Sequence, residues 1–169
     1  MTTIRAAVEA DLPAIVAIYN TAIPGRMATA DLDPVSSDSR LGWFHQHSHH
    51  HPLWVMELDQ AIVGWLGFQP FYGRPAYRAT VELSLYVSPS HSRRGFGRQL
   101  LQEAIDRSPT LGFTTLLGFI FAHNEPSLRL FQGAGFQQWG YLPQVAELDG
   151  IQRDLVILGC RISEGENPG

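Results

Sequence analysis

Arginine and glycine residues in the middle of the chain form the segment with the clearest capacity for chemistry. Residues 93–98 read Arg-Arg-Gly-Phe-Gly-Arg and follow an apolar stretch that Pro89 ends. Glycine lets a backbone approach a ligand closely, and a helix N-terminus offers free N–H groups and a positive dipole to an anion. Arg93, Arg94 and Arg98 add positive charge there. The segment predicts a pyrophosphate-binding loop, and a turn that merely begins a helix is the alternative.

Two common phosphate loops do not fit this segment. A dinucleotide-binding loop would need a third glycine where the chain has Leu100. A P-loop needs Gly-Lys followed by serine or threonine, and the chain contains no such sequence. Gly95, Phe96 and Gly97 are therefore expected to shape a different anion-binding loop that leads into a helix.

The overall composition is that of a globular protein. Of the 169 residues, 44% are hydrophobic and 17% are charged, and the formal net charge is −4. This charge gives no overall attraction to nucleic acid, and no apolar run approaches the roughly 20 residues that cross a bilayer. The single cysteine, Cys160, allows no internal disulfide and lies in an apolar run, where packing is its expected role. A cytoplasmic protein with neither a nucleic-acid nor a membrane partner is the simplest expectation.

Hydrophobic periodicity and turn residues predict alternating strands and helices. Asp11 is the candidate N-cap of the first helix. The order β-α-α-β-β-β-α-β-α-β-β predicts an α/β fold with a mixed sheet. Residues 1–162 are expected to form a single domain, and residues 163–169 a disordered tail. Helices are expected at 11–22, 36–46, from the glycine-rich loop to about 107, and at 126–133, and strands at 3–7, 53–58, 61–68, 79–87, 114–121, 136–142 and 151–162.

A histidine-rich stretch, residues 45–51, invites interpretation as a metal site. His47 and His51 have the i, i+4 spacing that can bind zinc on a helix. No cysteine lies nearby, and Pro52 ends the helix. A solvated helix end is therefore favoured, and no metal site is expected.

Two ordered motifs resemble those of the GNAT superfamily of N-acetyltransferases. The first is Ser92-Arg93-Arg94-Gly95-Phe96-Gly97 after Val87-Ser88-Pro89, although Ser92 replaces the leading glutamine or arginine of the family. The second is Asn-Glu-Pro-Ser-Leu-Arg-Leu-Phe at residues 124–131, followed by Gly135-Phe136. The likeness extends over about residues 3–162. A closer similarity, to the phosphinothricin and methionine sulfone acetyltransferase branch, is carried by residues 18–20, 80–82, 85–87, 142–145 and 153–155.

This resemblance implies a fold, a reaction and an assembly. The fold is a mixed, mostly antiparallel, splayed sheet flanked by helices. The reaction transfers acetyl from acetyl-coenzyme A, without a metal, to the amino group of a small molecule. The acceptor is expected to be an amino acid or an analogue of the phosphinothricin, methionine sulfoximine or methionine sulfone type. Similar sequences form homodimers. A protein or peptide acetyltransferase, or a non-catalytic acyl-coenzyme A-binding module, is the alternative.

The resemblance also suggests roles for the strand that precedes the loop. Glu82, which matches the glutamate of the closer branch, is the candidate general base for the acceptor amine. An ordinary strand carboxylate paired with Arg78 is the alternative. Backbone groups of Leu85, Tyr86 and Val87 are expected to pair with the pantetheine arm of the cosubstrate. The Val87 N–H would also stabilise the developing oxyanion, so Val87 is the second candidate catalytic residue.

Further site residues are expected on either side of this strand. Asn124 is predicted to hydrogen-bond the pantetheine arm or a nearby loop, or to act as a helix N-cap, and Ser127 is a weaker candidate cofactor contact. Phe131 stands where many members have tyrosine or, in the closer branch, histidine, so it lacks the proton donor for the leaving thiolate. A thiol with a pKa of about 8.5 leaves fairly well without one. Arginine binds carboxylates with paired hydrogen bonds, and the candidate residues for binding the acceptor are Arg74, Tyr77 and Arg78.

Overall fold

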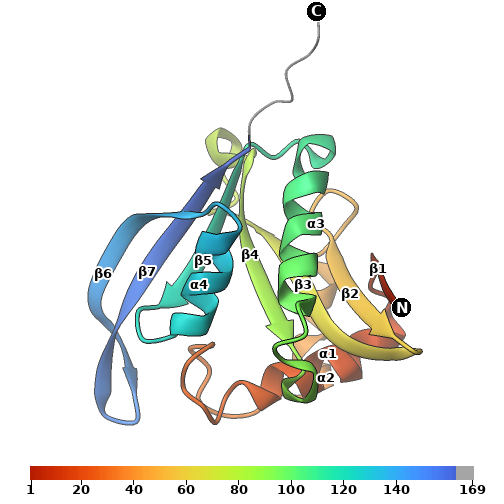
Figure 1. Cartoon of the computed structure of the whole chain (residues 1–169), viewed down its shortest axis with the longest axis horizontal. Helices are drawn as coiled ribbons and strands as arrows, with labels where there is room; N and C mark the ends of the chain where they lie inside the picture. The colour runs from red at the N-terminus through yellow and green to blue at the C-terminus, as the bar shows by residue number, and fades with distance from the viewer. Residues whose placement is uncertain (163–169) are drawn as a thin grey trace, which may run out of the picture.

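The computed structural model describes residues 1–162, which form one seven-stranded sheet with helices on both faces (Figure 1). The strands lie in the order β1-β2-β3-β4-β5-β7-β6. Only the β4–β5 pair is parallel, and every other pair is antiparallel. The mostly antiparallel mixed sheet expected from the resemblance is thus confirmed. The strands are β1 (Thr2–Ala6), β2 (Leu53–Leu58), β3 (Ala61–Pro70), β4 (Thr80–Val87), β5 (Thr115–Phe121), β6 (Gln137–Leu148) and β7 (Ile151–Arg161).

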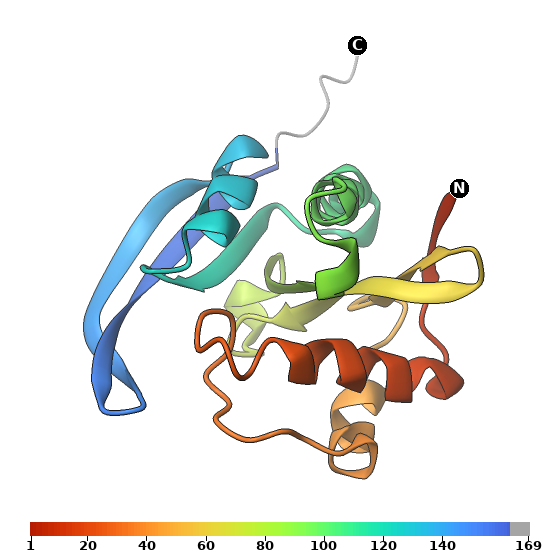
Figure 2. The same ribbon diagram turned by 60° about the horizontal axis from the view of Figure 1, so that its bottom comes forward.

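The four helices divide between the two faces of the sheet, as Figure 2 shows. Helices α1 (Leu12–Thr21) and α2 (Ser37–His45) cover one face, and α3 (Phe96–Leu111) and α4 (Glu125–Gly133) lie on the other. Three short 3₁₀ helices occupy residues 9–11, 75–77 and 89–91. No helix among residues 1–162 has the length and apolar character of a membrane-spanning segment.

Because helices cover both faces, the central strands bury successive residues on opposite sides. On the α3 side, Leu100 and Leu101 pack with Phe68 and their neighbours in the larger core. On the α1 side, Ile15 belongs to a smaller core that includes Trp65. Strands that are buried on both faces contain continuous apolar runs instead of strict alternation. The run of buried residues from Leu66 to Phe68 on β3 is an example.

Strands β4 and β5 pair over a very short distance. Thr80–Glu82 are in register with Thr115–Leu117, and no pairing follows. Beyond that point β4 stays with β3 as far as Val87, while β5 stays with β7 as far as Phe121. The two strands therefore diverge (Figure 1), and the expected splay of the sheet is confirmed.

Three expected details of the elements were wrong. Helix α3 continues through Pro109 to Leu111 instead of ending near residue 107, because the left-handed residue that ends it is Gly112, at φ 85. Strand β6 continues to Leu148 instead of 142, since a register shift between Leu142 and Ala146 lets its pairing with β7 resume.

Asp11 also differs from expectation, because its side chain caps no N–H group of α1. Asp11 Oδ1 and Oδ2 accept two hydrogen bonds from Arg5, and Oδ2 also accepts one from the Val8 N–H. Asp11 thereby joins the start of α1 to β1. The expectation of a disordered tail at 163–169 lies outside the described residues.

A glycine on β5 is required for α4 to approach the sheet. A Cβ atom on Gly118 would lie 2.9 Å from the ring of Phe131, which is buried and packs edge-on against Phe136 at 5.0 Å. We therefore expect Gly118→Ala to displace the ring and destabilise the fold by about 1 to 3 kcal/mol, the usual cost of overpacking a core. Urea denaturation measures this change.

Gly133→Ala is the control for that variant, because a Cβ atom there meets nothing within 4 Å. At the end of a helix it should leave stability unchanged or raise it by up to about 1 kcal/mol. Equal stabilities for the Gly118 and Gly133 variants would show that the packing of Phe131 does not depend on the absence of a Cβ atom at residue 118.

Candidate active site

The glycine-rich segment forms the open N-terminus of α3. Gly95 precedes the helix at φ 80, and no side chain caps the helix. The first helical hydrogen bond runs from the Gln99 N–H to the Gly95 carbonyl at 3.0 Å. The N–H groups of Phe96, Gly97 and Arg98 therefore have no partner within the helix. Arg93 also has a positive φ, 61°, which is uncommon for a residue with a side chain.

A hollow lies against this helix end, and we call it the outer hollow. Gly97 forms part of its wall. A Cβ atom on Gly97 would lie 3.3 Å from Leu130 and 3.7 Å from Val87, so a side chain there would crowd both residues. Arg94 is exposed, and its guanidinium lies 5.2 Å from the Phe96 ring centre. The outer hollow is lined by Leu85, Val87, His91, Ser92, Arg93, Gly95, Phe96, Gly97, Arg98, Pro126, Ser127, Leu130 and Phe131.

A second hollow, the inner hollow, continues from the first along β4. The two share Leu85, Ser127 and Phe131, so together they form one groove, which we call the β4 groove. The inner hollow reaches Glu82, the last residue of β4 that pairs with β5. Its lining comprises residues 27–30, 82–86 and 119–121 together with Asn124, Ser127, Phe131, Val145, Ala146 and Leu155.

Backbone groups of β4 face the β4 groove. The Ser88 N–H donates to the Val63 carbonyl of β3 at 2.8 Å. Since N–H and C=O groups of successive strand residues point to alternate sides, those of Leu85 and Val87 point away from β3 and toward the gap. Of the three residues whose backbone was expected to pair with a pantetheine arm, Leu85 and Val87 therefore face a space with no neighbouring strand, whereas the groups of Tyr86 point toward β3.

Glu82 lies half-buried where β4 and β5 part. Burial raises the pKa of its carboxyl group above the ordinary glutamate value. No ion pair within 4.0 Å joins Glu82 to any described residue, so the alternative of a salt bridge with Arg78 is not found. Glu82, Ser84 and Tyr86 alternate with apolar residues of β4 that pack toward α3. These three side chains therefore project toward the face that carries α1 and α2.

The loop between α1 and α2 covers the inner hollow, a role that the sequence analysis did not anticipate. Side chains from three distant elements bind its carbonyl groups or its arginine. The contacts are Tyr86 Oη to the Ala28 carbonyl at 3.0 Å, Asn124 Nδ2 to the Met27 carbonyl at 3.1 Å, His123 Nε2 to the Arg26 carbonyl at 2.8 Å, and Arg26 Nε to Asp149 at 2.9 Å.

Asn124 and Phe131 stand on either side of Ser127 along the groove. Asn124 Oδ1 accepts the Ser127 N–H at 3.3 Å, so Asn124 is the N-cap of α4, and its amide also holds the loop at Met27. Phe131 is buried and lines both hollows, where it presents only carbon. The ring fixes the width of the groove but supplies no proton.

The three candidate acceptor-binding residues lie apart from Glu82. Arg74, Tyr77 and Arg78 are exposed in and around the 3₁₀ helix at 75–77 and line neither hollow. The Tyr77 ring packs edge-on against Phe71 at 5.3 Å. Within one chain these side chains are not brought to the groove.

The histidine-rich stretch is not a helix beyond His45, so the helical spacing of His47 and His51 was wrong. His47 Nδ1 lies 3.0 Å from the Trp43 carbonyl, and burial lowers the pKa of its ring. The His51 ring packs against Phe113 at 5.3 Å. Residues 1–162 hold no group of three metal-binding side chains.

Comparisons with known proteins agree with this geometry. The sequence profile described as the acetyltransferase (GNAT) family matches residues 14–136. YwnH of Bacillus subtilis (strain 168), provisionally named a phosphinothricin acetyltransferase, is 47% identical over 95% of this chain and 99% of its own. The L-methionine sulfoximine/L-methionine sulfone acetyltransferase of Salmonella typhimurium is 33% identical over 98% of each chain.

A solved structure extends the comparison to the cosubstrate. The phosphinothricin acetyltransferase from Sinorhizobium meliloti, in complex with acetyl-coenzyme A, superposes with a TM-score of 0.90 at 29% identity, covering 98% of this chain and 90% of that one. The open helix end, the gap beside β4 and these likenesses lead to one conclusion: the chain belongs to the acetyltransferase (GNAT) family and is an acetyl-coenzyme A-dependent acetyltransferase.

Proposed function

We propose that this enzyme acetylates the amino group of a small amino acid or amino-acid analogue, in the cytoplasm where acetyl-coenzyme A is made and used. The observation that carries the proposal is a groove that begins at an uncapped helix N-terminus and ends at a half-buried, unpaired carboxylate. The covering loop at residues 27–30 narrows the inner end, which favours a small acceptor over a protein segment. The names of the relatives support an amino-acid analogue as acceptor.

The residues of the outer hollow fit a diphosphate. Three helical N–H groups lack a partner within the helix, and an anion at a helix N-terminus is favoured by both these donors and the dipole. Arg93, Arg94 and Arg98 surround this end and are exposed, so they can move to the phosphates. The groove then leads along the free backbone edge of Leu85 and Val87. Acetyl-coenzyme A supplies the thioester whose acetyl group is transferred.

Glu82 is proposed as the general base. Amines of amino acids are mostly protonated near neutral pH, and attack on a carbonyl requires the neutral form. Glu82 projects toward the α1–α2 face at the inner end of the groove, and its burial raises the pKa of its carboxyl group. A carboxylate with a raised pKa is a stronger base for the ammonium proton. The Val87 N–H faces the gap, where it would donate to the carbonyl oxygen as charge develops.

Because phenylalanine has no proton to donate, the thiolate must leave without a proton from residue 131. A thiol with a pKa of about 8.5 is a moderately good leaving group, so the proposed enzyme works without an acid there. Asn124 and Ser127, at the start of α4, line the groove opposite β4. They are proposed to contact the pantetheine arm as well as to hold the loop and the helix end.

A homodimer is also proposed. The hairpin of β6 and β7 exposes several large apolar side chains, and β6 is an edge strand. Exposed apolar patches and free edges are typical of surfaces that another chain covers. Arg74, Tyr77 and Arg78 do not line their own groove, and we propose that in the dimer they complete an acceptor site. The exposed large apolar residues of the hairpin are Trp139, Tyr141, Leu142, Val145 and Ile151.

Replacing the base gives the first functional prediction. Glu82→Gln should lower kcat/KM for the acceptor about 100-fold, as loss of a general base typically does, with an unchanged Kd for acetyl-coenzyme A. Only the ionised carboxylate accepts a proton, so the Glu82 contribution is present above its pKa and lost as the pH falls through it. Because that pKa is raised, the loss begins above the ordinary carboxyl range. A thiol-release assay across pH measures both effects.

Glu103→Gln is the matched control for Glu82→Gln, because Glu103 lies on α3 and pairs with Arg107. It should keep the wild-type pH profile. Full activity and an unchanged profile in the Glu82 variant would rule out the base assignment. Acetyl-coenzyme A binding without thiol release, across a wide amine panel, would instead favour the non-catalytic binding module.

The helix end gives the second functional prediction. Gly95→Leu places a side chain at φ 80 beside the three free N–H groups. We expect the Kd for acetyl-coenzyme A to rise at least about tenfold, equivalent to 1.4 kcal/mol. Gly112→Leu is the control, because Gly112 has φ 85 at the opposite end of the same helix. Both variants should lose stability, but calorimetric titration should find weakened binding only for Gly95→Leu. Equal affinities would contradict the assignment of the loop.

The dimer gives the third functional prediction. Light scattering on the purified protein should give twice the chain mass of 18.8 kDa. Leu142→Asp and Ile151→Asp should shift the protein toward monomer, because a buried unpaired charge is costly. Val8→Asp, at an exposed apolar residue far from the hairpin in sequence, should not. A wild-type monomer would exclude the dimer and the completed acceptor site.

A further inference from the structure

The two hollows of the β4 groove meet at three residues, Leu85, Ser127 and Phe131. A ligand that extends from the open end of α3 to Glu82 must pass between them. In the proposed complex the thioester carbonyl accepts the Val87 N–H, so the sulfur on the same carbon lies between the β4 edge and α4. Ser127 and Phe131 belong to α4, and Ser127 is the one of the three shared residues with a polar side chain.

The Ser127 hydroxyl is free to meet a ligand. Ser127 is the third residue of α4, and its N–H donates to Asn124 Oδ1 at 3.3 Å. The residue is half-buried, yet its hydroxyl makes no hydrogen bond to any described residue and its oxygen keeps some accessible surface. Polar groups in such surroundings normally have a partner, and the groove is where this hydroxyl can find one.

The position of Ser127 relative to Phe131 shows how a serine can act at this point of the groove. The two residues are four apart, so they lie on the same face of the helix. Long side chains of a helix lean toward its N-terminus, over the residue four positions earlier. The hydroxyl of a tyrosine at residue 131 would therefore point toward Ser127, which already carries a hydroxyl there. The first turn of a helix also favours negative charge.

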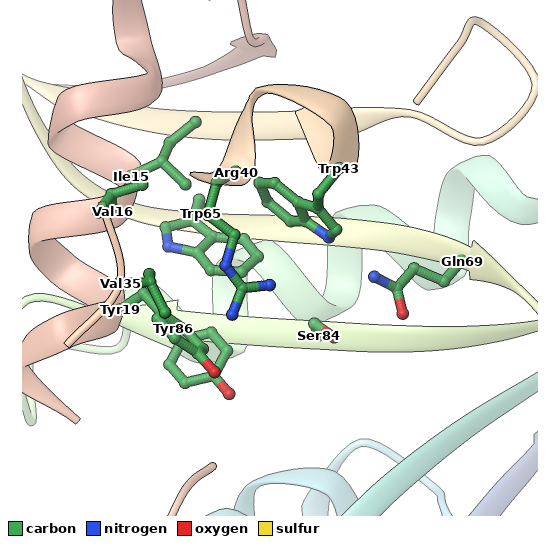
Figure 3. Close-up of a pocket in the computed structure, with 10 residues that line it drawn as sticks. All are labelled: Ile15, Val16, Tyr19, Val35, Arg40, Trp43, Trp65, Gln69, Ser84 and Tyr86. Carbon is green, nitrogen blue, oxygen red and sulfur yellow. The ribbon is translucent and has the colours of Figure 1, made fainter. Parts of the chain in front are cut away.

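The other hydroxyl groups of the inner hollow are bonded elsewhere or face away from α4. Tyr86 Oη donates to a carbonyl of the covering loop at 3.0 Å, and Thr29 Oγ1 lies 2.5 Å from Tyr19 Oη. Figure 3 shows Ser84 and Tyr86 on the face of the sheet that α2 covers, whereas α4 lies on the opposite face (Figure 2). Ser127 is therefore the hydroxyl of the inner hollow that lies on the α4 side.

We propose that the Ser127 hydroxyl donates a hydrogen bond to the sulfur of coenzyme A as the thiolate leaves, and so supplies stabilisation that Phe131 cannot give. The proposal rests on the proposed function, because it requires the thioester to lie at the Val87 N–H. When the carbon–sulfur bond breaks, its electron pair stays on the sulfur, and the acetyl carbon keeps its new bond to the acceptor nitrogen. Ser127 retains its own proton, so the thiolate takes a proton from solvent after release. Ser127 is thus a catalytic residue beside Glu82 and Val87.

The ionisation of the bound thiol tests this proposal without turnover. The probe is coenzyme A labelled with ¹³C at the carbon bonded to sulfur, because the chemical shift of that carbon changes as the thiol loses its proton. A hydrogen bond to the thiolate lowers the pKa of the thiol. Ser127→Ala should therefore raise the pKa of the bound thiol by about half a unit to one unit, the three- to tenfold effect of one hydrogen bond. Ser127→Thr, which keeps the hydroxyl, should stay close to the wild-type value. An unchanged thiol pKa in Ser127→Ala would overturn the proposal.

Ser39→Ala is the matched control for this measurement. Ser39 is the third residue of α2, and its N–H likewise donates to the side chain of the N-cap residue, Ser36, at 3.1 Å. Ser39 lines neither hollow, so its replacement should leave the pKa of the bound thiol unchanged. A shift as large as that of Ser127→Ala would show that the effect does not come from a contact with the sulfur, and would contradict the proposal.

Single-turnover rates of acetyl transfer give an independent test. A hydrogen bond that strengthens as charge develops on sulfur acts on the transfer step more than on binding. Ser127→Ala should slow this step about three- to tenfold, while the Kd for acetyl-coenzyme A stays within about twofold of the wild-type value. A weakened affinity with an unaltered transfer rate would make Ser127 a binding residue only and would refute the catalytic role.

The two proposals can fail separately. If Gly95→Leu weakens the binding of acetyl-coenzyme A but the thiol pKa does not respond to Ser127→Ala, the groove stands and the role of Ser127 is wrong. If Ser127→Ala raises the pKa of the bound thiol although no amino acid is acetylated, the contact with sulfur is correct and the proposed acceptor is wrong.

Discussion

The short pairing of β4 with β5 is the constraint on which the rest of the site depends. Only Thr80–Glu82 pair with Thr115–Leu117, and the strands then separate because each keeps its other neighbour. Backbone groups at a strand edge need partners, so the edge at Leu85 and Val87 is left available to an extended ligand. The same separation opens a passage between the two faces of the sheet. The open N-terminus of α3 and Glu82 are therefore joined by a single groove.

The loop between α1 and α2 depends on that groove for its position. Its carbonyl groups are held by Tyr86 from β4 and by His123 and Asn124 from the segment before α4. Asn124 also caps α4, because its side-chain oxygen Oδ1 accepts the Ser127 N–H. A movement of α4, which flanks the groove, would thus be transmitted to the loop that covers the inner hollow. The same loop also fixes Arg40 of α2, through Asp31.

Local patterns predicted most of the fold, and long-range register decided the rest. The open helix start at Gly95 followed from residues adjacent in sequence, as did the break between the strands at 53–58 and 61–68, where Asp59 and Gln60 both have positive φ. The C-terminal end of β6 could not be predicted in this way, because a bulge after Leu142 shifts the register before the pairing with β7 resumes at Ala146.

Glu82 and the glycine-rich loop line one groove, but the sequence could not place Arg74 or Arg78, which line neither of its hollows. Those arginines are attached to a short 3₁₀ segment whose direction no local pattern specifies. Arg40 shows the reverse case. Its position on α2 carried no recognisable motif, yet the salt bridge with Asp31 and the contact with Tyr19 bring it to the face of the sheet that Glu82 shares.

A phenylalanine at residue 131 suits the apolar neighbours of its ring. The ring lies on Gly118 and against Phe136, so these two sides of it meet only carbon atoms. A buried polar group without a partner is destabilising. The proton balance of the reaction does not require one there. In the proposed reaction the first proton of the ammonium group passes to Glu82. The second leaves the nitrogen for solvent as the amide forms, and the thiolate, whose conjugate acid has a pKa of about 8.5, takes a proton from solvent after release. That reaction needs a base at the inner end of the groove and no proton donor at Phe131.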